Sequence, residues 1–278
     1  GDCAILYRTN AQSRLLEEKL IASNIPYKIV GGVNFYSRKE VKDLLAYLKT
    51  VDNARDELAV RRIINIPKRG IGAASLAKVS AYAEVNSLNF YQALERAREI
   101  PGLGRAAGKM EPFVDLIASL RELAALGGVS AVLEEVLEQT GYVRELEAED
   151  TPEAQARIEN IDELMNKAIS YEQENEEPTL SGFLEEVALV ADIDSLAEDQ
   201  NYVVLMTLHS AKGLEFPNVY LSGMEDGLFP SYMSITSDDA EAELEEERRL
   251  CYVGITRAKE HLTITGARVR MQRGETQY

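Results

Sequence analysis

Apolar runs typical of β-strands lie near both ends of the chain, and a long segment with helical periodicity separates them. Near the N-terminus, Cys3–Tyr7 and Tyr27–Val30 flank a helical pattern for which Asn10 is the predicted N-cap. Strands are expected again at 202–206, 219–221 and 261–265. Strands that alternate with helices form parallel sheets, so the sequence predicts an α/β protein.

Helical spacing of apolar residues dominates from about residue 37 to residue 196, with interruptions at glycine and proline. We predict about eight helices in this segment and find no internal repeat. The simplest architecture is one α/β domain with an all-helical insertion, because insertions are tolerated where chain entry and exit lie close together. The predicted divisions are 1–34 and 201–278 for the α/β domain and 35–200 for the helical domain.

The net charge of −17 at first argues against a nucleic-acid partner, but the charge is unevenly distributed. Residues 1–110 hold 18 Lys and Arg against 11 Asp and Glu, whereas the remaining 168 residues hold 12 against 36. A polyanion can therefore bind the N-terminal part. No apolar run is long enough for a membrane span, no secretory signal is seen, and Cys3 and Cys251 are expected to be buried thiols of a cytoplasmic protein.

Polar groups are concentrated directly after the expected strand 202–206. A hydroxyl, an imidazole, an ammonium, a glycine and a carboxylate come from Thr207, His209, Lys212, Gly213 and Glu215. A lone His or Lys is most simply part of a surface turn. Five such groups at one strand end favour a ligand site, because ligands of open α/β sheets bind at the carboxyl ends of strands.

The segment Glu245–Lys259 combines a charged helix with a Gly-Ile-Thr turn that precedes Arg257. Acid–base pairs at i,i+4 in the helix can simply form a solvated face. An arginine on a rigid element also suits a bidentate phosphate contact, or an arginine finger supplied to a neighbouring nucleotide site. The residues alone leave both interpretations open.

A glycine-containing segment precedes an expected helix at 68–75. Gly70 and Gly72 allow close approach of the backbone to a phosphate, and Lys68 and Arg69 add positive charge. An ordinary glycine turn explains the pattern equally well. The segment 102–110 superficially looks like a phosphate loop but lacks the Walker A spacing and hydroxyl, so we predict a loop between helices there.

Together these segments resemble the UvrD/PcrA/Rep family of superfamily 1 DNA helicases. The runs TLHSAKGLEF, GMEDGLFP and EEERRLCYVGITRA resemble motifs V, Va and VI, and AILYRTNAQSR, GGVNFYSRKEVKD and IPKRGIG resemble earlier landmarks in the same order. The resemblance covers essentially the whole chain. It implies a RecA-like parallel-sheet motor domain, 2A, interrupted by a large all-helical domain, 2B. The family moves 3′ to 5′ along single-stranded DNA using ATP and Mg²⁺.

The resemblance also implies roles for individual residues. Arg257 corresponds to the arginine that reaches the γ-phosphate, and Glu215, close to Gly213, to the acid that binds the ribose. The positions implied for the single strand are Arg8, Thr9, Asn10, Thr207 and His209. Those implied for duplex DNA are Lys68, Arg69, Gly70, Ile71 and Gly72. Arg273 stands where the family often has an aromatic residue that stacks on a base.

Two parts of the family's active site are missing from the sequence. It contains no GxxxxGK[ST] element and no buried-strand Asp-Glu pair for Mg²⁺, which the family carries in domain 1A. We therefore expect the C-terminal portion of a DNA repair or replication helicase, inactive alone, with no metal site of its own and no membrane association.

The expected partners are single-stranded DNA, duplex–single-strand junctions, the N-terminal half with domains 1A and 1B, and repair or transcription proteins, in a cytoplasmic, nucleoid-associated setting. The alternative is a stand-alone DNA- or protein-binding module that kept the helicase shape. A third possibility, an acidic scaffold that binds only proteins, is disfavoured by the basic residues of 1–110.

Overall fold

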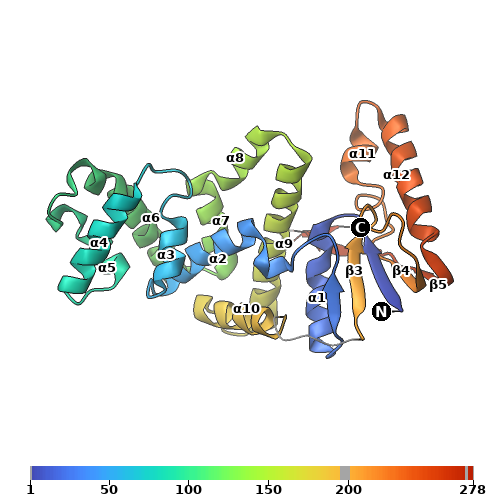
Figure 1. Cartoon of the computed structure of the whole chain (residues 1–278), viewed down its shortest axis with the longest axis horizontal. Coiled ribbons are helices and arrows are strands. Elements are labelled where there is room, and N and C mark those ends of the chain that lie inside the picture. The colour runs from blue at the N-terminus through green and yellow to red at the C-terminus, as the bar shows by residue number, and fades with distance from the viewer. Residues whose placement is uncertain (1, 195–200, 273–274, 278) are drawn as a thin grey trace. The chain divides into compact units, whose positions relative to one another are not determined.

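The computed structural model describes residues 2–194, 201–272 and 275–277. It divides into two compact units, one formed by Gly1–Arg38 with Ala188–Tyr278 and the other by Lys39–Val187 (Figure 1). Both cysteines are half-buried and unpaired. None of the described helices combines the length and apolar character needed to cross a lipid bilayer.

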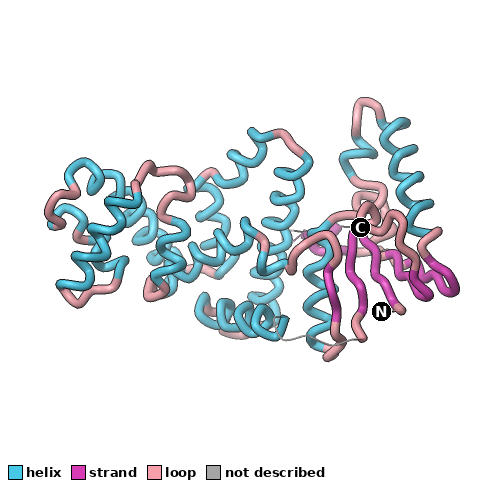
Figure 2. Tube along the Cα trace, in the orientation of Figure 1, coloured by secondary structure: helices cyan, strands magenta, loops and turns pink. Residues whose placement is uncertain are grey.

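The first unit contains a five-stranded parallel sheet in the order β2-β3-β1-β4-β5. Its strands are β1 (Cys3–Tyr7), β2 (Tyr27–Ile29), β3 (Val203–Thr207), β4 (Phe216–Leu221) and β5 (Ala258–Ile264). Figure 2 shows these strands side by side, although β1 is separated by most of the chain from its neighbours β3 and β4. The predicted α/β class with a parallel sheet is confirmed. A separate antiparallel pair is formed by β6 (Arg270–Gln272) and β7 (Glu275–Gln277).

One face of the sheet carries an apolar core of this unit. Alternate residues of the three central strands point to the same face, as the two-residue period of a strand requires. The buried residues of this core are Ala4, Leu6, Val204, Met206, Leu208, Ala211, Val219, Leu221 and Phe229. Helix α12 (Ala240–Ile255) packs on them through Leu250 and Cys251. Burial raises the pKa of the Cys251 thiol above its ordinary value.

The other helical elements of this unit are η1 (Asn10–Gln12), α1 (Ser13–Ala22), η2 (Phe35–Ser37) and α11 (Tyr232–Thr236). The prediction that Asn10 caps a helix is wrong. Asn10 is the first residue of the 3₁₀ turn η1, and Thr9, whose backbone is extended at φ −126° and ψ 153°, takes the capping position. Two backbone N–H groups, those of Arg8 and Thr9, donate to the Gln12 Oε1 atom at 2.9 and 3.0 Å, which orders the start of the element.

The second unit consists of helices and loops throughout its described residues (Figure 2). Its helices are α2 (Lys39–Asp52), α3 (Glu57–Ile63), α4 (Ala73–Val85), α5 (Phe90–Glu95), η3 (Ala97–Glu99), η4 (Gly104–Ala106), α6 (Ala107–Leu126), α7 (Val129–Thr140), α8 (Tyr142–Glu149) and α9 (Pro152–Glu174). Helix α10 (Leu180–Asp194) begins in this unit. Helix α2 packs against α3, α6, α7 and α9, so it lies at the centre of the unit.

The helical periodicity read from the sequence agrees with the burial of α2. The predicted core positions Val41, Leu44, Leu45 and Leu48 are all buried. The predicted loop over 102–110 is partly wrong, because its second half is the 3₁₀ turn η4 and the first turn of α6. Met110 of this segment is fully buried. Its apolar side chain therefore helps to fix the first turn of α6 in the core of the unit.

Candidate functional site

The residues that follow β1, β2 and β3 meet at the carboxyl edge of the sheet. Tyr7 and Thr207 are register partners at the ends of β1 and β3, and the ladder continues as the Leu208 N–H donates to the Tyr7 carbonyl at 2.9 Å. The residues that follow β2 lie beside the residues that follow β3. A Cβ added to Gly31 would stand 2.6 Å from Ser210 Oγ, so Gly31 and Ser210 are in contact.

Five predicted site residues belong to this edge. We call them the carboxyl-edge cluster: Arg8, Thr9, Asn10, Thr207 and His209. The Thr207 hydroxyl lies 3.0 Å from the Ser210 hydroxyl. The Asn10 Oδ1 atom would be 3.5 Å from a Cβ on Gly32. Hydroxyls, an amide and closely packed glycine backbone therefore come together from three strand ends.

Arg8 of this cluster is bound to a carboxylate that the sequence analysis did not single out. Its Nε donates to Glu247 Oε1 at 2.9 Å and to Oε2 at 3.1 Å, and its Nη2 donates to Oε1 at 2.7 Å. The Arg8 side chain is 23% exposed and that of Glu247 only 7%. This charge-assisted, shielded pair joins the end of β1 to α12.

The acid–base pairs of Arg248 and Arg249 lie on a solvated face of α12, as one of the two interpretations allowed, but Glu247 does not. Glu247 and Gly254 are the buried residues of α12. They are seven positions apart, and Leu250 lies between them, so all three share one face of the helix. The sequence did contain a signal for this burial, because Glu247 occupies a position on the face of α12 that otherwise carries apolar residues. It could not show the partner, because Arg8 lies near the other end of the chain.

His209 lies in the electrostatic field of this pair. Partial burial is the main cause that lowers the pKa of its imidazole, and the positive charge of Arg8 lowers it further. Glu247 and Glu246 act in the opposite direction. The net effect keeps His209 neutral near pH 7, so it presents one donor and one acceptor at the carboxyl edge.

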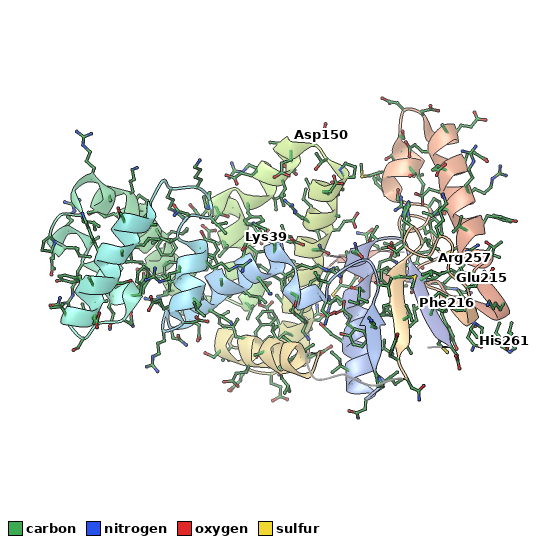
Figure 3. All side chains as sticks on the ribbon, in the orientation of Figure 1. Lys39, Asp150, Glu215, Phe216, Arg257 and His261 are labelled. Atoms are coloured by element: carbon green, nitrogen blue, oxygen red, sulfur yellow. The ribbon has the colours of Figure 1, made fainter. Side chains whose placement is uncertain are left out.

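The remaining predicted residues of this unit lie at the starts of β4 and β5. Glu215 precedes β4 and Arg257 precedes β5, and Figure 3 shows these two side chains beside Phe216. The Phe216 N–H donates to the Arg257 carbonyl at 2.9 Å, and Arg257 Nη1 donates to the Leu214 carbonyl at 2.9 Å. We call Gly213, Glu215 and Arg257 the amino-edge cluster.

Arg257 also closes the end of α12. Its Nε donates to the Val253 carbonyl at 3.0 Å, and its Nη2 donates to the Thr256 hydroxyl at 3.1 Å. A cation at this position is stabilised by the negative end of the helix dipole. Glu215 is more open to solvent. Its carboxylate lies 3.5 Å from Lys259 Nζ, and both side chains are more than half exposed.

The two clusters lie at opposite edges of one sheet, which corrects the expectation that the polar groups of 206–216 gather at one strand end. Thr207 is level with Tyr7, whereas β4 begins two residues before Asn218, which is level with Cys3. At ~3.3 Å per residue the edges are roughly 15–20 Å apart. Because β3 and β4 are parallel, the loop 208–215 must return from one edge to the other.

The glycine turn of the second unit is held by groups that the sequence analysis missed. Asn65 clamps Ile71, donating from Nδ2 to its carbonyl at 2.8 Å and accepting from its N–H at 3.1 Å. Ile71 is buried, whereas Lys68, Gly70 and Gly72 are exposed. Gly70 has φ +67°, a conformation that favours glycine.

Arg69 is partly buried, and its guanidinium is bound by groups of the protein itself. Its Nη1 donates to the carbonyls of Ile63 and Ile64, both at 3.0 Å, and its guanidinium lies 5.1 Å from the centre of the Phe113 ring. Arg69 therefore also has a structural role, because unpaired carbonyls at the end of α3 need donors. Arg273 lies outside the described residues.

Comparison with known proteins agrees with the motifs. The UvrD-like helicase C-terminal domain family matches residues 1–268. The ATP-dependent DNA helicase PcrA of Bacillus subtilis is 47% identical over 282 residues, which cover 99% of this chain and 38% of the relative. PcrA of Staphylococcus aureus is 49% identical over 278 residues, covering 99% of this chain and 38% of the relative.

PcrA of Staphylococcus epidermidis is similar to the same degree, with 48% identity over 279 residues. The chain thus spans about 38% of the length of the curated relatives it matches. The resemblance inferred from the motif runs is confirmed, and the chain belongs to the UvrD-like helicase C-terminal domain family.

Proposed function

We propose that this chain forms domains 2A and 2B of an ATP-dependent DNA helicase that moves 3′ to 5′ along single-stranded DNA. In this proposal residues 1–34 and 201–278 form the RecA-like domain 2A, and residues 35–200 form the helical insertion 2B. The full-length protein would use ATP and Mg²⁺, act at duplex–single-strand junctions in DNA repair or replication, and work in the cytoplasm at the nucleoid.

The observation that carries the proposal is the pair of connections between the two edges of the sheet. The loop 208–215 and helix α12 both run from the carboxyl-edge cluster to the amino-edge cluster. Glu247, at the middle of α12, holds Arg8, and Arg257 lies two residues beyond the C-terminal end of the helix. The ten residues from Glu247 to Arg257 correspond to a rise of about 15 Å, which suits the distance across the sheet.

The amino-edge cluster has the chemistry of a nucleotide contact. A γ-phosphate bound in a neighbouring domain would supply the negative charge that Arg257 is suited to neutralise. Arg257 now donates to two carbonyls and a hydroxyl, and a guanidinium has five N–H donors to redistribute. The exposed carboxylate of Glu215 can accept from ribose hydroxyls, and Gly213, at φ +86° with open space around it, lets the backbone come close.

The carboxyl-edge cluster has the chemistry of a contact with the DNA backbone. Asn10, Thr207 and neutral His209 offer donors and acceptors without sequence information, which suits a protein that must move along any sequence. Arg8 contributes through Nη1, for which the described residues provide no partner, while Glu247 holds the rest of its guanidinium. In the proposed duplex contact, Lys68 and the Gly70–Gly72 backbone are the exposed parts, and Arg69 would have to give up bonds to carbonyls to reach a phosphate.

The test is Arg257→Ala in the full-length protein. We expect DNA-stimulated ATP turnover to fall about 10³-fold, which is the usual size of an arginine-finger effect, while affinity for single-stranded DNA changes less than about twofold because Arg257 is remote from the carboxyl edge. Arg249→Ala is the matched control, since Arg249 is an exposed residue of α12 whose ion pairs within the described part of the chain are with Glu245 and Glu246.

Because Arg257 also closes α12, a second variant separates catalysis from folding. Arg257→Lys keeps a cation that can reach the Val253 carbonyl but loses the planar fork. It should melt at the wild-type temperature and still lose most of the turnover. Near-normal kcat in either variant would remove Arg257 from the active site.

A further inference from the structure

Two glycine turns of the second unit are alike in their first two residues. Gly70-Ile71-Gly72 precedes α4, and Gly102-Leu103-Gly104 leads into α6 through η4, whose first residue is Gly104. The third glycines differ, with φ −79° at Gly72 and +54° at Gly104. The first glycine of each has positive φ, +67° at Gly70 and +73° at Gly102. The central aliphatic residue is buried in both, with Ile71 4% and Leu103 5% exposed.

The third glycine of each turn is open to the outside. A Cβ on Gly72 or on Gly104 would have no atom within 4 Å. Each turn therefore anchors an aliphatic side chain inward and leaves bare backbone outward, the arrangement that lets a phosphodiester come close.

The two turns are neighbours, and each is braced by a lysine from the helix that follows the other. Lys109 of α6 donates to the Gly70 carbonyl at 3.1 Å. Lys78 of α4 donates to the Gly102 carbonyl at 2.5 Å. Figure 1 shows α4 and α6 side by side with α5. Each ammonium keeps two further N–H donors.

The surface formed by the two turns is positively charged. Lys68, Lys78, Arg105 and Lys109 are exposed. None of these four makes a salt bridge within the ranges 2–194, 201–272 and 275–277, and the nearby acids Glu99 and Glu111 are engaged by Tyr82 and Arg98. A cavity of about 400 Å³ borders the second turn at Gly104, Ala107 and Gly108, so the surface there is hollowed.

We infer that the turn Gly102–Gly104, with Arg105 and Lys109, is a second contact for the backbone of double-stranded DNA beside the turn Gly70–Gly72. This inference rests on the proposed helicase function and extends its duplex surface. Two neighbouring turns match the two phosphate strands that border a groove of the double helix, whereas a single strand offers one. Unpaired cations and open backbone supply contacts that do not depend on sequence.

The test uses the full-length protein and measures binding of a labelled blunt duplex and of labelled oligo-dT against salt concentration. Arg105→Gln should weaken duplex binding about five- to tenfold near 0.1 M salt and reduce the slope of log K against log salt by about 0.9, the value for one lost phosphate contact. Binding of oligo-dT should not change. Arg55→Gln removes an equally exposed cation at the far end of α3 and is the matched control.

A second pair of variants probes the open backbone. Asp and Asn both tolerate positive φ, so Gly104→Asp and Gly104→Asn should fold alike, and only the negatively charged variant should repel the duplex. The inference fails if Arg105→Gln and Gly104→Asp lose no more duplex affinity than Arg55→Gln and Gly104→Asn. If Lys68→Gln weakens duplex binding in the same experiment, the proposed function stands without the second turn. If the wild-type protein binds neither DNA, both are overturned.

Discussion

At the scale of single residues, three arginines that the sequence analysis assigned to polar ligands make different contacts. Arg69 is turned inward to carbonyls, Arg8 is held by Glu247, and Arg257 closes a helix end. The guanidinium suits carbonyls, carboxylates and phosphates alike. The sequence pattern around each arginine could therefore indicate a polar partner but not which one.

His209 offers a test at this scale because two charges act on its imidazole with opposite sign. We expect its pKa to lie below the ordinary value of about 6.5, since partial burial and Arg8 disfavour the protonated form. Arg8→Gln should raise this pKa, and Glu247→Gln should lower it further. Histidine NMR titration measures the pKa directly, and the protein's only other histidine, His261, is identified by His261→Gln.

The lowered pKa of His209 also determines how the free energy of unfolding depends on pH. Because the pKa of folded His209 is lowered, its contribution to the free energy of unfolding is complete above the ordinary histidine pKa and is lost as the pH falls through the lowered value. A His209 pKa at or above its ordinary value would show that partial burial and Arg8 do not dominate, and a pKa that Arg8→Gln leaves unchanged would show that Arg8 does not act on the imidazole.

At the scale of elements, the packing of α12 on the sheet sets the positions of both clusters. Gly254 is the closest point of this contact. A Cβ there would stand 2.4 Å from Leu208 Cδ2 and 3.0 Å from Leu221 Cδ2, and both leucines are 1% exposed. The helix can lie this close only because residue 254 has no side chain.

Gly254→Ala should therefore destabilise the chain, although alanine is the better helix former. Overpacking costs about 1–3 kcal/mol and outweighs the ~1 kcal/mol gain in helix propensity. Gly108→Ala in α6 is the control, because a Cβ there meets nothing within 4 Å, and it should stabilise by about 0.5–1 kcal/mol. Urea unfolding followed by circular dichroism should give opposite signs, and a neutral Gly254→Ala would contradict the packing argument.

At the scale of the whole molecule, this sequence contains the two sheet edges proposed to contact DNA and nucleotide but no Walker A element. We expect the 278-residue chain to bind single-stranded DNA and to hydrolyse ATP no faster than background. Phosphate-release assays with and without oligo-dT measure this. The same chain with Arg257→Ala controls for a contaminating ATPase, and DNA-stimulated turnover that this substitution abolishes would show a complete site.

Much of the architecture was predictable because it depends on local patterns. The run Cys3–Tyr7 is β1, and the acidic stretch that begins at Ala240 is α12. Strand–helix alternation implied a parallel sheet, and the motif runs around Glu215 and Arg257 identified the family. These signals lie within a few residues of one another, where period and residue type determine the outcome.

Only the tertiary structure showed that Thr207 and Glu215, eight positions apart, belong to opposite edges of the sheet. It also showed that Glu247 is buried against Arg8, and that the turn at Gly102 lies beside the turn at Gly70. The physical reason is the same in each case. Strand register, removal of a charge from water and contact between helices depend on residues far apart in the chain, and no local pattern records which of them will meet.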